Sequence, residues 1–159
     1  MTNFRVGIGY DIHQLKEGNF LVLGGVNIAH SKGTVAHSDG DVVIHAICDA
    51  LLGAAGLGDI GHFFPDHDNR YKDIDSKILL LEVFREIKKK GYKVVNVDIS
   101  ILLEQPKLKK HNSSMKEVIA DCLNVTVDRI NIKATTSEKL GFIGKEEGIA
   151  CYAVALIES

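Results

Sequence analysis

Asp11 and His13 are the first residues along the chain whose types and spacing could do chemistry. They stand two positions apart, directly after the strand-like segment 4–9. Side chains two apart on an extended segment point to the same side, so a carboxylate and an imidazole converge there. Because short motifs often arise by chance, the pair taken alone also fits an exposed turn.

A polar stripe on an otherwise apolar helix offers this pair a partner. Residues 41–57 would be apolar on almost every side of a helix, and the exceptions are Asp41, His45 and Asp49, at intervals of four. A helix that is apolar on most sides is buried. Its polar stripe therefore faces either a hydrogen-bond network in the core or a cleft that holds a ligand.

Asp11, His13 and His45 together match the ligand set of a zinc site. Zinc takes carboxylate and imidazole ligands, and three protein ligands leave the fourth position open, as in catalytic zinc sites. Asp49 could then orient His45 without binding the metal itself. The alternative is that His45 is hydrogen-bonded in the core and binds no metal.

Two segments could bind an anion. His37 and Ser38 precede the apolar helix, where backbone N–H groups favour negative charge, although Ser38 also fits a simple N-cap. In the segment 133–141, three consecutive hydroxyl residues are followed by Glu138. The hydroxyls and nearby lysines could hold a phosphate and Glu138 a cation such as magnesium, or the segment could be only a capping motif.

Two further loops could contact the rest of a ligand. The loop 58–68 is rich in carboxylates and turn formers, and loops often carry specificity. Its Asp59 and Asp66 could accept hydrogen bonds from sugar hydroxyls or could solvate a surface turn. The lysine-rich stretch 107–110 is either a solvated face or, beside Pro106, part of a nucleotide pocket.

Helix signals occur in three places. Helices are predicted over 39–57 with Ser38 as N-cap, over 76–90, and over 115–123 with a capping box of Ser114 and Glu117. The predicted apolar face of the second helix consists of Ile78, Leu81 or Leu80, Phe84 and Ile87.

Strand signals alternate with these helices. Strands are predicted over 4–9, 20–23, 94–103, 130–134 and 149–157. The pattern favours an α/β (α+β) two-layer sandwich, a mixed β-sheet covered on one face by helices. The last strand is apolar on both faces, so we expect its second face to be covered, with a neighbouring subunit as one candidate.

Length and composition exclude several classes of protein. A chain of 159 residues with 45% hydrophobic and 25% charged residues predicts one globular domain over 1–159. A net charge of −2 argues against nucleic acid as a partner. The three cysteines form no paired motif, and no signal-like segment or apolar run of about 18 residues is present. We therefore expect a cytoplasmic protein without a membrane span.

Several longer motifs follow one another along the chain. They are Gly9-Tyr10-Asp11-Ile12-His13, Ala36-His37-Ser38-Asp39-Gly40-Asp41, Asp49-Ala50-Leu51-Leu52-Gly53-Ala54, Leu57-Gly58-Asp59-Ile60-Gly61, Phe64-Pro65-Asp66, and Lys133-Ala134-Thr135-Thr136 with Glu138-Lys139-Leu140-Gly141-Phe142. In this order they resemble the 2-C-methyl-D-erythritol 2,4-cyclodiphosphate synthase family of the non-mevalonate isoprenoid pathway. The resemblance runs from Gly7 to Ile157.

The resemblance implies an assembly and its metals. The family would form a homotrimer whose sheets pack around a threefold axis, with an active site between each pair of subunits and a central apolar channel. Each subunit would hold one Zn²⁺ on Asp11, His13 and His45. Glu138 would bind the Mg²⁺ or Mn²⁺ that bridges a diphosphate.

The resemblance also implies roles for other residues. His37 and Thr136 would be catalytic, stabilising the transition state, and Lys145 stands where the family commonly has arginine. Ser38 would contact phosphate, Asp59 and Gly61 ribose, and Asp66 the methylerythritol. The full set implied to contact the substrate is Asp11, Ile12, His13, His37, Ser38, Asp59, Ile60, Gly61, Phe64, Pro65, Asp66, His67, Asp68, Leu103, Glu104, Gln105, Pro106, Lys107, Leu108, Lys109, Ala134, Thr135, Thr136, Ser137, Glu138, Phe142 and Lys145.

The implied reaction converts 4-diphosphocytidyl-2-C-methyl-D-erythritol 2-phosphate to the 2,4-cyclodiphosphate and CMP, the work of a phosphorus–oxygen lyase. The substrate's own 2-phosphate is the nucleophile, so no protein base is assigned. Two other interpretations stay open. One is a metal-dependent phosphohydrolase that uses the same ligands to activate water, and the other is a non-catalytic trimer that binds an isoprenoid diphosphate in the channel.

Overall fold

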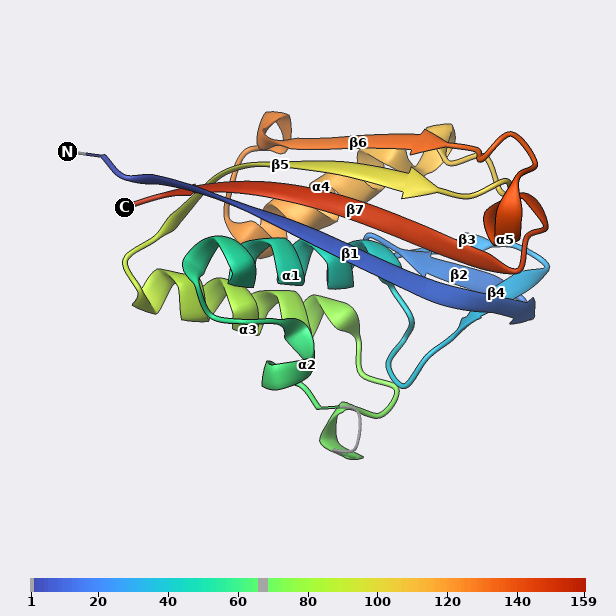
Figure 1. Ribbon diagram of the computed structural model, residues 1–159, viewed down its shortest axis with the longest axis horizontal. Helices are drawn as coiled ribbons and strands as arrows, with labels where there is room; N and C mark the ends of the chain where they lie inside the picture. Colours follow the sequence, from blue (N-terminus) through green and yellow to red (C-terminus); the bar gives the residue numbers. More distant parts are fainter. Residues whose placement is uncertain (1, 66–68) are drawn as a thin grey trace.

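A single mixed β-sheet forms one layer of the molecule, and helices form the other (Figure 1). The computed structural model describes residues 2–65 and 69–159. The strand order is β4-β1-β7-β5-β6, and only β5 and β6 are parallel. The strands are β1 (Phe4–Glu17), β4 (Lys32–Val35), β7 (Gly148–Glu158), β5 (Lys93–Leu102) and β6 (Ile130–Thr135). The two-layer fold with a mixed sheet is therefore confirmed.

The strands differ from the prediction in length and number. β1 continues eight residues beyond Gly9, through the predicted ligands to Glu17. The predicted strand at Phe20–Leu23 (β2) pairs only with β3 (Val26–Ala29) in a separate hairpin. β3 and β4 were not predicted, because strands of four residues are too short to show a clear alternation of apolar and polar residues.

The central helix α1 (Val42–Ala55) is capped by Asp41 and not by Ser38 as predicted. The fully buried Asp41 carboxylate accepts hydrogen bonds from the N–H groups of Val43 and Ile44, both at 3.1 Å. It also accepts from Gly24 and Gly25 in the β2–β3 turn, at 2.9 and 2.6 Å. One side chain thus caps the helix and fixes the hairpin to it.

Two other helices complete the helical layer. α3 (Ser76–Lys89) packs on α1, and α4 (Asn112–Leu123) packs on β6 and α3. The predicted apolar face of α3 is partly wrong, because Leu79, Leu80, Val83 and Ile87 are buried while Ile78 is 49% exposed. The short helical segments are α2 (Ile60–Phe63), α5 (Gly141–Gly144) and the 3₁₀ turns Asn69–Tyr71, Lys109–His111 and Val127–Arg129.

The start of α4 also differs from the prediction. The helix begins at Asn112, so Ser114 lies inside its first turn and cannot be the N-cap. His111 occupies the N-cap position and its side chain makes no capping hydrogen bond. The predicted capping box is therefore wrong.

Two glycines allow β1 to lie directly on the backbone of α1. A Cβ atom at Gly9 would lie 1.9 Å from the carbonyl oxygen of Ala46, and one at Gly7 would lie 2.0 Å from that of Ala50. Neither distance is tolerable, so only glycine fits at these positions. The close approach places residues 7–9 of β1 against residues 46–54 of α1.

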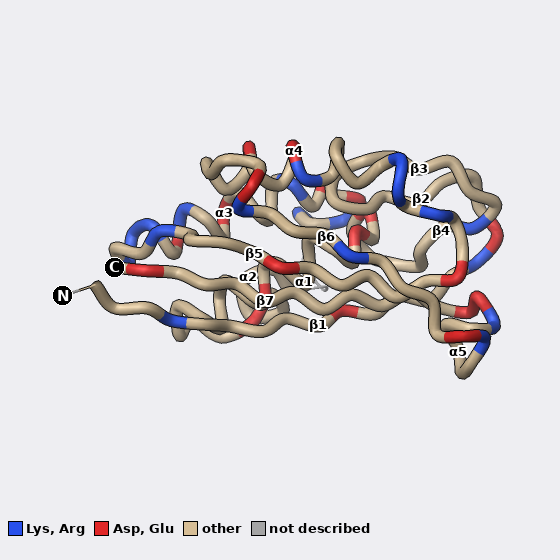
Figure 2. The backbone as a smooth tube through the Cα atoms, turned by 90° about the horizontal axis from the view of Figure 1, so that it is seen from above, with Lys and Arg blue, Asp and Glu red and all other residues tan. Residues whose placement is uncertain are grey.

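The sheet face that points away from α1 is apolar and exposed. Val6 and Ile8 on β1 are each 68% exposed, and Tyr152 and Val154 on β7 are also exposed. Figure 2 shows long uncharged stretches of β1 and β7, drawn tan. The sequence-based expectation that β7 has a second apolar face therefore holds. In the parts of the chain that the structure describes, no helix is long and apolar enough to cross a membrane.

Gly9→Ala is expected to destabilise the protein by about 1–3 kcal/mol, the usual cost of overpacking, because the helix backbone must move to make room. Gly53→Ala is the matched control. It adds the same methyl group to α1, where the nearest atom beyond the helix backbone would be 4.0 Å away, and removing a helical glycine stabilises by about 0.5–1 kcal/mol. Urea unfolding at equal protein concentration measures both, and equal stability of the two variants would contradict the close approach.

Candidate active site

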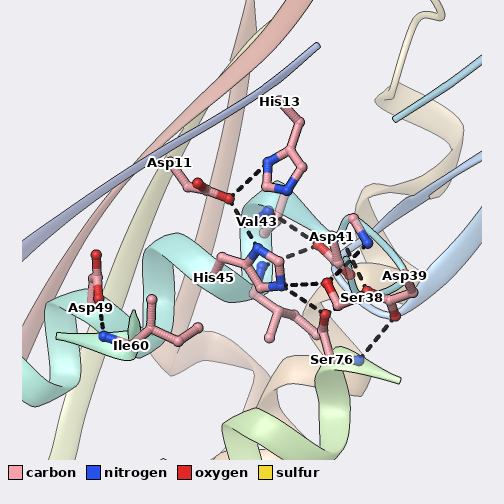
Figure 3. Close-up of polar contacts among 12 residues, drawn as sticks. Asp11, His13, Ser38, Asp39, Asp41, Val43, His45, Asp49, Ile60 and Ser76 are labelled. Atoms are coloured by element: carbon pink, nitrogen blue, oxygen red, sulfur yellow. Dashed lines mark hydrogen bonds and ion pairs between the residues drawn. The ribbon is translucent and has the colours of Figure 1, made fainter. Parts of the chain in front are cut away.

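Three side chains from β1 and α1 converge on one point (Figure 3). Asp11 Oδ2 lies 3.0 Å from His13 Nδ1 and 3.1 Å from His45 Nδ1. Asp11 and His13 point to the same side because they stand two apart on a strand, as the sequence predicted. His45, one turn into α1, faces them because the two backbones are in contact.

This cluster fits a metal ion. One ligand atom from each residue lies within 4.8 Å of the others, and ligand atoms about 2.0 Å from zinc would be about 3.3 Å apart at the corners of a tetrahedron. His13 Nδ1 is buried and has no hydrogen-bond partner of good geometry, despite its closeness to Asp11. A buried polar atom without a partner is costly, and a metal ion would satisfy it.

The charges of the cluster also suit a cation. Burial alone would raise the pKa of Asp11, but the neighbouring imidazoles of His13 and His45 lower that pKa to about 2. Burial would lower the pKa of His45, but its hydrogen bond to Asp11 and the negative charge of that carboxylate raise it. Asp11 is therefore ionised at neutral pH and attracts positive charge to the cluster.

Asp49 does not orient His45, so that expectation is wrong. Its Oδ1 accepts a hydrogen bond from the N–H of Ile60 at 2.8 Å, and burial raises its pKa. The ring nitrogens of His45 instead contact Asp11, Ser38 and Ser76. Asp49 thus holds the start of α2 against α1.

A pocket of about 410 Å³ contains the cluster. The predicted site residues that line it are Asp11, Ile12, His13, His37, Ser38, His45, Ile60, Gly61 and Phe64. Gln14, Tyr71 and Ile74 also line it, although the sequence did not predict them. They belong to no recognised motif of the sequence, so only the folded structure reveals that they lie here.

Other predicted contacts of the loop 58–68 lie elsewhere. Asp59 is the N-cap of α2, where its Oδ1 accepts from the N–H of His62 at 2.9 Å. Asp59 and Pro65 do not line the pocket. Asp66, His67 and Asp68 lie outside the described residues, so their substrate contacts stay predictions.

A second group of predicted site residues gathers where the parallel strands β5 and β6 end. It consists of 103–109 and 134–138, and the N–H of Leu103 joins the two parts by donating to Thr135 O at 3.0 Å. The side chains of Leu103 and Leu108 are buried in the core, so a ligand would meet them through their backbone. None of this group lines the 410 Å³ pocket, and neither do Phe142 and Lys145.

Glu104 organises the loop that carries Thr136 and Glu138. Its Oε1 accepts from the N–H of Ser137 at 3.1 Å and from the N–H of Lys139 at 3.3 Å. Burial would raise the pKa of Glu104, but the ammonium group of Lys139 and these amides lower it. Thr136 in turn donates its hydroxyl to Glu138 at 3.0 Å, so the predicted catalytic threonine and the predicted magnesium ligand are neighbours.

Known proteins match this chain along nearly its whole length. The model of the YgbB family matches residues 4–158. A protein of Thioalkalivibrio sulfidiphilus named 2-C-methyl-D-erythritol 2,4-cyclodiphosphate synthase is 56% identical over 159 residues, covering 100% of this chain and 99% of that relative.

Solved structures match it as well. The bifunctional IspDF of Campylobacter jejuni has a TM-score of 0.96 at 42% identity, over 99% of this chain and 43% of that longer one. The IspF of Plasmodium falciparum, described as a CDP complex, has a TM-score of 0.85 at 39% identity, over 97% of this chain and 95% of that one.

After loading with zinc and dialysis, we expect the parent protein to retain its metal. The single variants Asp11→Ala, His13→Ala and His45→Ala should each lose it, because two ligands hold the ion far less tightly than three. His62→Ala is the matched control, since His62 is exposed and is not part of the cluster. Elemental analysis measures metal per chain. Unchanged metal content in the three ligand variants would contradict the site.

Proposed function

Because the chain belongs to the YgbB family, we propose that it converts 4-diphosphocytidyl-2-C-methyl-D-erythritol 2-phosphate to 2-C-methyl-D-erythritol 2,4-cyclodiphosphate and CMP, the reaction of a cyclodiphosphate synthase. The observation that carries the proposal is the cluster of Asp11, His13 and His45 in a pocket, in a chain matched from end to end. The relative described as a CDP complex supports a cytidine diphosphate as substrate.

The reaction needs no base from the protein. An oxygen of the 2-phosphate attacks the β-phosphorus, and the bond from that phosphorus to the oxygen of the departing CMP breaks. A phosphate monoester has a second pKa near 6, so the attacking group is already largely a dianion at pH 7. The main obstacle is repulsion between two anions that must come together, and positioning with positive charge offsets it.

In this proposal Asp11, His13 and His45 hold zinc at the pocket wall. Zinc, when bound, supplies positive charge that stabilises the phosphoryl oxygens. Carboxylate and imidazole ligands form the donor set of catalytic zinc sites. The buried Nδ1 of His13, which has no hydrogen-bond partner, supports the assignment.

His37 and Ser38 would complete the phosphate site on this chain. Both line the pocket beside the cluster, and the carbonyl of His37 accepts from the N–H of Asp73 at 2.8 Å, which fixes the backbone there. The hydroxyl of Ser38 would donate to a phosphate oxygen. The imidazole of His37 would stabilise charge on the reacting phosphoryl group.

The remaining substrate contacts would come from a neighbouring subunit of a homotrimer. The groups 103–109 and 134–138 lie outside the pocket, so another subunit would bring them to it. They include Thr136, Glu138 as ligand of Mg²⁺ or Mn²⁺, and the backbone that would hold cytosine. The exposed apolar face of β1 and β7 supports such an assembly, because apolar surface of this kind marks protein interfaces.

A central channel would follow from that packing. Tyr10, Phe142 and Tyr152 line an apolar pocket of about 310 Å³ beside the open sheet face, and Lys145 follows directly after α5. An isoprenoid diphosphate could bind there.

The buried, unpaired Cys48, Cys122 and Cys151 are compatible with the proposed cytoplasmic location.

Incubation of the zinc-loaded protein with the diphosphocytidyl substrate and magnesium is expected to yield CMP and the cyclic diphosphate. Phosphorus NMR distinguishes the cyclic product from an open-chain one. CMP with an open-chain product would contradict the proposal and indicate a hydrolase on the same metal site. A zinc-loaded trimer without turnover would instead indicate a binding protein.

Ile8→Glu is expected to convert the trimer to monomers, because it places a charge in the centre of the proposed interface, where burial without a partner is costly. Turnover should fall as the trimer dissociates, since each proposed active site needs residues from a neighbouring subunit. Ile78→Glu is the matched control on the exposed side of α3. Light scattering measures the mass, with the trimer at three times the 17.4 kDa chain mass. A trimeric Ile8→Glu variant would contradict this interface.

A further inference from the structure

The second ring nitrogen of His45 contacts a buried hydroxyl that the function proposed above does not use. His45 Nδ1 faces Asp11, and Nε2 on the opposite side of the ring lies 3.0 Å from Ser76 Oγ and 3.2 Å from Ser38 Oγ (Figure 3). Ser76 is the first residue of α3 and is fully buried. It does not line the pocket, whereas Ser38 does.

Asp39 determines which way the hydroxyl of Ser76 points. Its carboxylate accepts the N–H of Ser76 at Oδ2, at 2.9 Å, and the hydroxyl of Ser76 at Oδ1. Oδ1 also accepts the N–H of Asp41 at 3.1 Å. An ionised carboxylate only accepts hydrogen bonds, and a hydroxyl has one proton to donate. The proton of Ser76 is therefore committed to Asp39.

The oxygen of Ser76 consequently presents a lone pair to His45. For Nε2 and Oγ to be hydrogen-bonded at 3.0 Å, Nε2 must carry the proton and donate it. Nδ1 lies 3.1 Å from the carboxylate of Asp11, which also only accepts, so Nδ1 donates there when the ring is protonated on both nitrogens. When a metal takes the place of that Nδ1 proton, the neutral imidazole keeps its proton on Nε2 and binds through the lone pair of Nδ1. Nδ1 is the atom that faces Asp11 and His13, where a metal would bind.

We propose that Ser76, held by Asp39, is the positioning residue that fixes the tautomer and ring orientation of His45, so that Nδ1 binds the metal. The inference rests on the metal site of the proposed function. Metal-binding histidines commonly donate their other ring N–H to an oxygen acceptor, which orients the ring and strengthens the ligand.

The acceptor is placed without help from His45. The segments around Asp39 and Ser76 are joined by backbone hydrogen bonds from Asp39 N to Ile74 O, at 3.1 Å, and from Asp73 N to His37 O, at 2.8 Å. These bonds hold the start of α3 beside the start of α1. Ser76 is therefore preorganised, and the ring of His45 docks onto a fixed oxygen.

Ser76→Ala in the zinc-loaded protein tests the role. We expect zinc affinity, measured by competition with a chromophoric chelator, to fall roughly ten- to a hundredfold. With ¹⁵N-labelled histidine, the parent should show His45 protonated on Nε2 and metal-bound through Nδ1. In the variant, the Nε2 proton should exchange faster with water. Ser113→Ala, at an exposed position in the first turn of α4, is the matched control and should match the parent.

Asp39→Asn is a second variant that keeps the shape of the side chain. Both oxygens of Asp39 accept donors, so an amide in either orientation places an N–H against another donor. The hydroxyl of Ser76 loses its fixed direction, and zinc affinity should again fall. If Ser76→Ala does not fold, the zinc affinity of Asp39→Asn alone tests the positioning role.

The outcomes separate this inference from the function on which it rests. A folded Ser76→Ala or Asp39→Asn variant with parental zinc affinity and an unchanged His45 spectrum would overturn the positioning role and leave the zinc site standing. A purely structural role would lower the melting temperature without changing either readout. A parent protein that binds no zinc would overturn both the inference and the metal site.

Discussion

The backbones of β1 and α1 touch at Gly7 and Gly9 with no side chain between them, and the candidate site depends on this contact. Two residues beyond Gly9, the same strand presents Asp11 and then His13. One turn into the helix, His45 is brought within 3.1 Å of Asp11. A larger residue at Gly9 would separate the elements by more than metal coordination tolerates, since ligand distances are fixed to within about 0.2 Å.

Under the proposed function, each chain would contribute two groups of residues to a shared site, and these groups do not line the same pocket within one chain. The cluster of Asp11, His13 and His45 lines one pocket together with His37 and Ser38, while Thr136 and Glu138 belong to a loop fixed by Glu104. The exposed apolar face of β1 and β7 is the surface on which the proposed neighbouring subunit would pack. A chain with a net charge of −2 has no general attraction for a polyanionic ligand, so in the proposed function the bound metal ions would provide the local positive charge.

The sequence predicted the part of the site that depends on local spacing. Asp11 and His13 converge through the geometry of one strand, and the polar stripe identified His45. Asp49 belongs to the same stripe but turns to Ile60, because spacing along a helix does not reveal which neighbour each side chain meets. Ser76 gave no signal beyond the start of a helix, since its contacts with Asp39 and His45 are tertiary. For the same reason Asp41, which bonds a distant hairpin, took the N-cap role expected of Ser38.

The most direct test of the proposed metal site is a crystal structure of the zinc-loaded protein with diffraction measured on both sides of the zinc absorption edge. We expect one anomalous peak per chain, bonded to Asp11 Oδ2, His13 Nδ1 and His45 Nδ1 at about 2.0–2.2 Å, with Glu138 of a neighbouring chain facing the same pocket. A peak elsewhere, or none between β1 and α1, would contradict the assignment of these three residues as a zinc site.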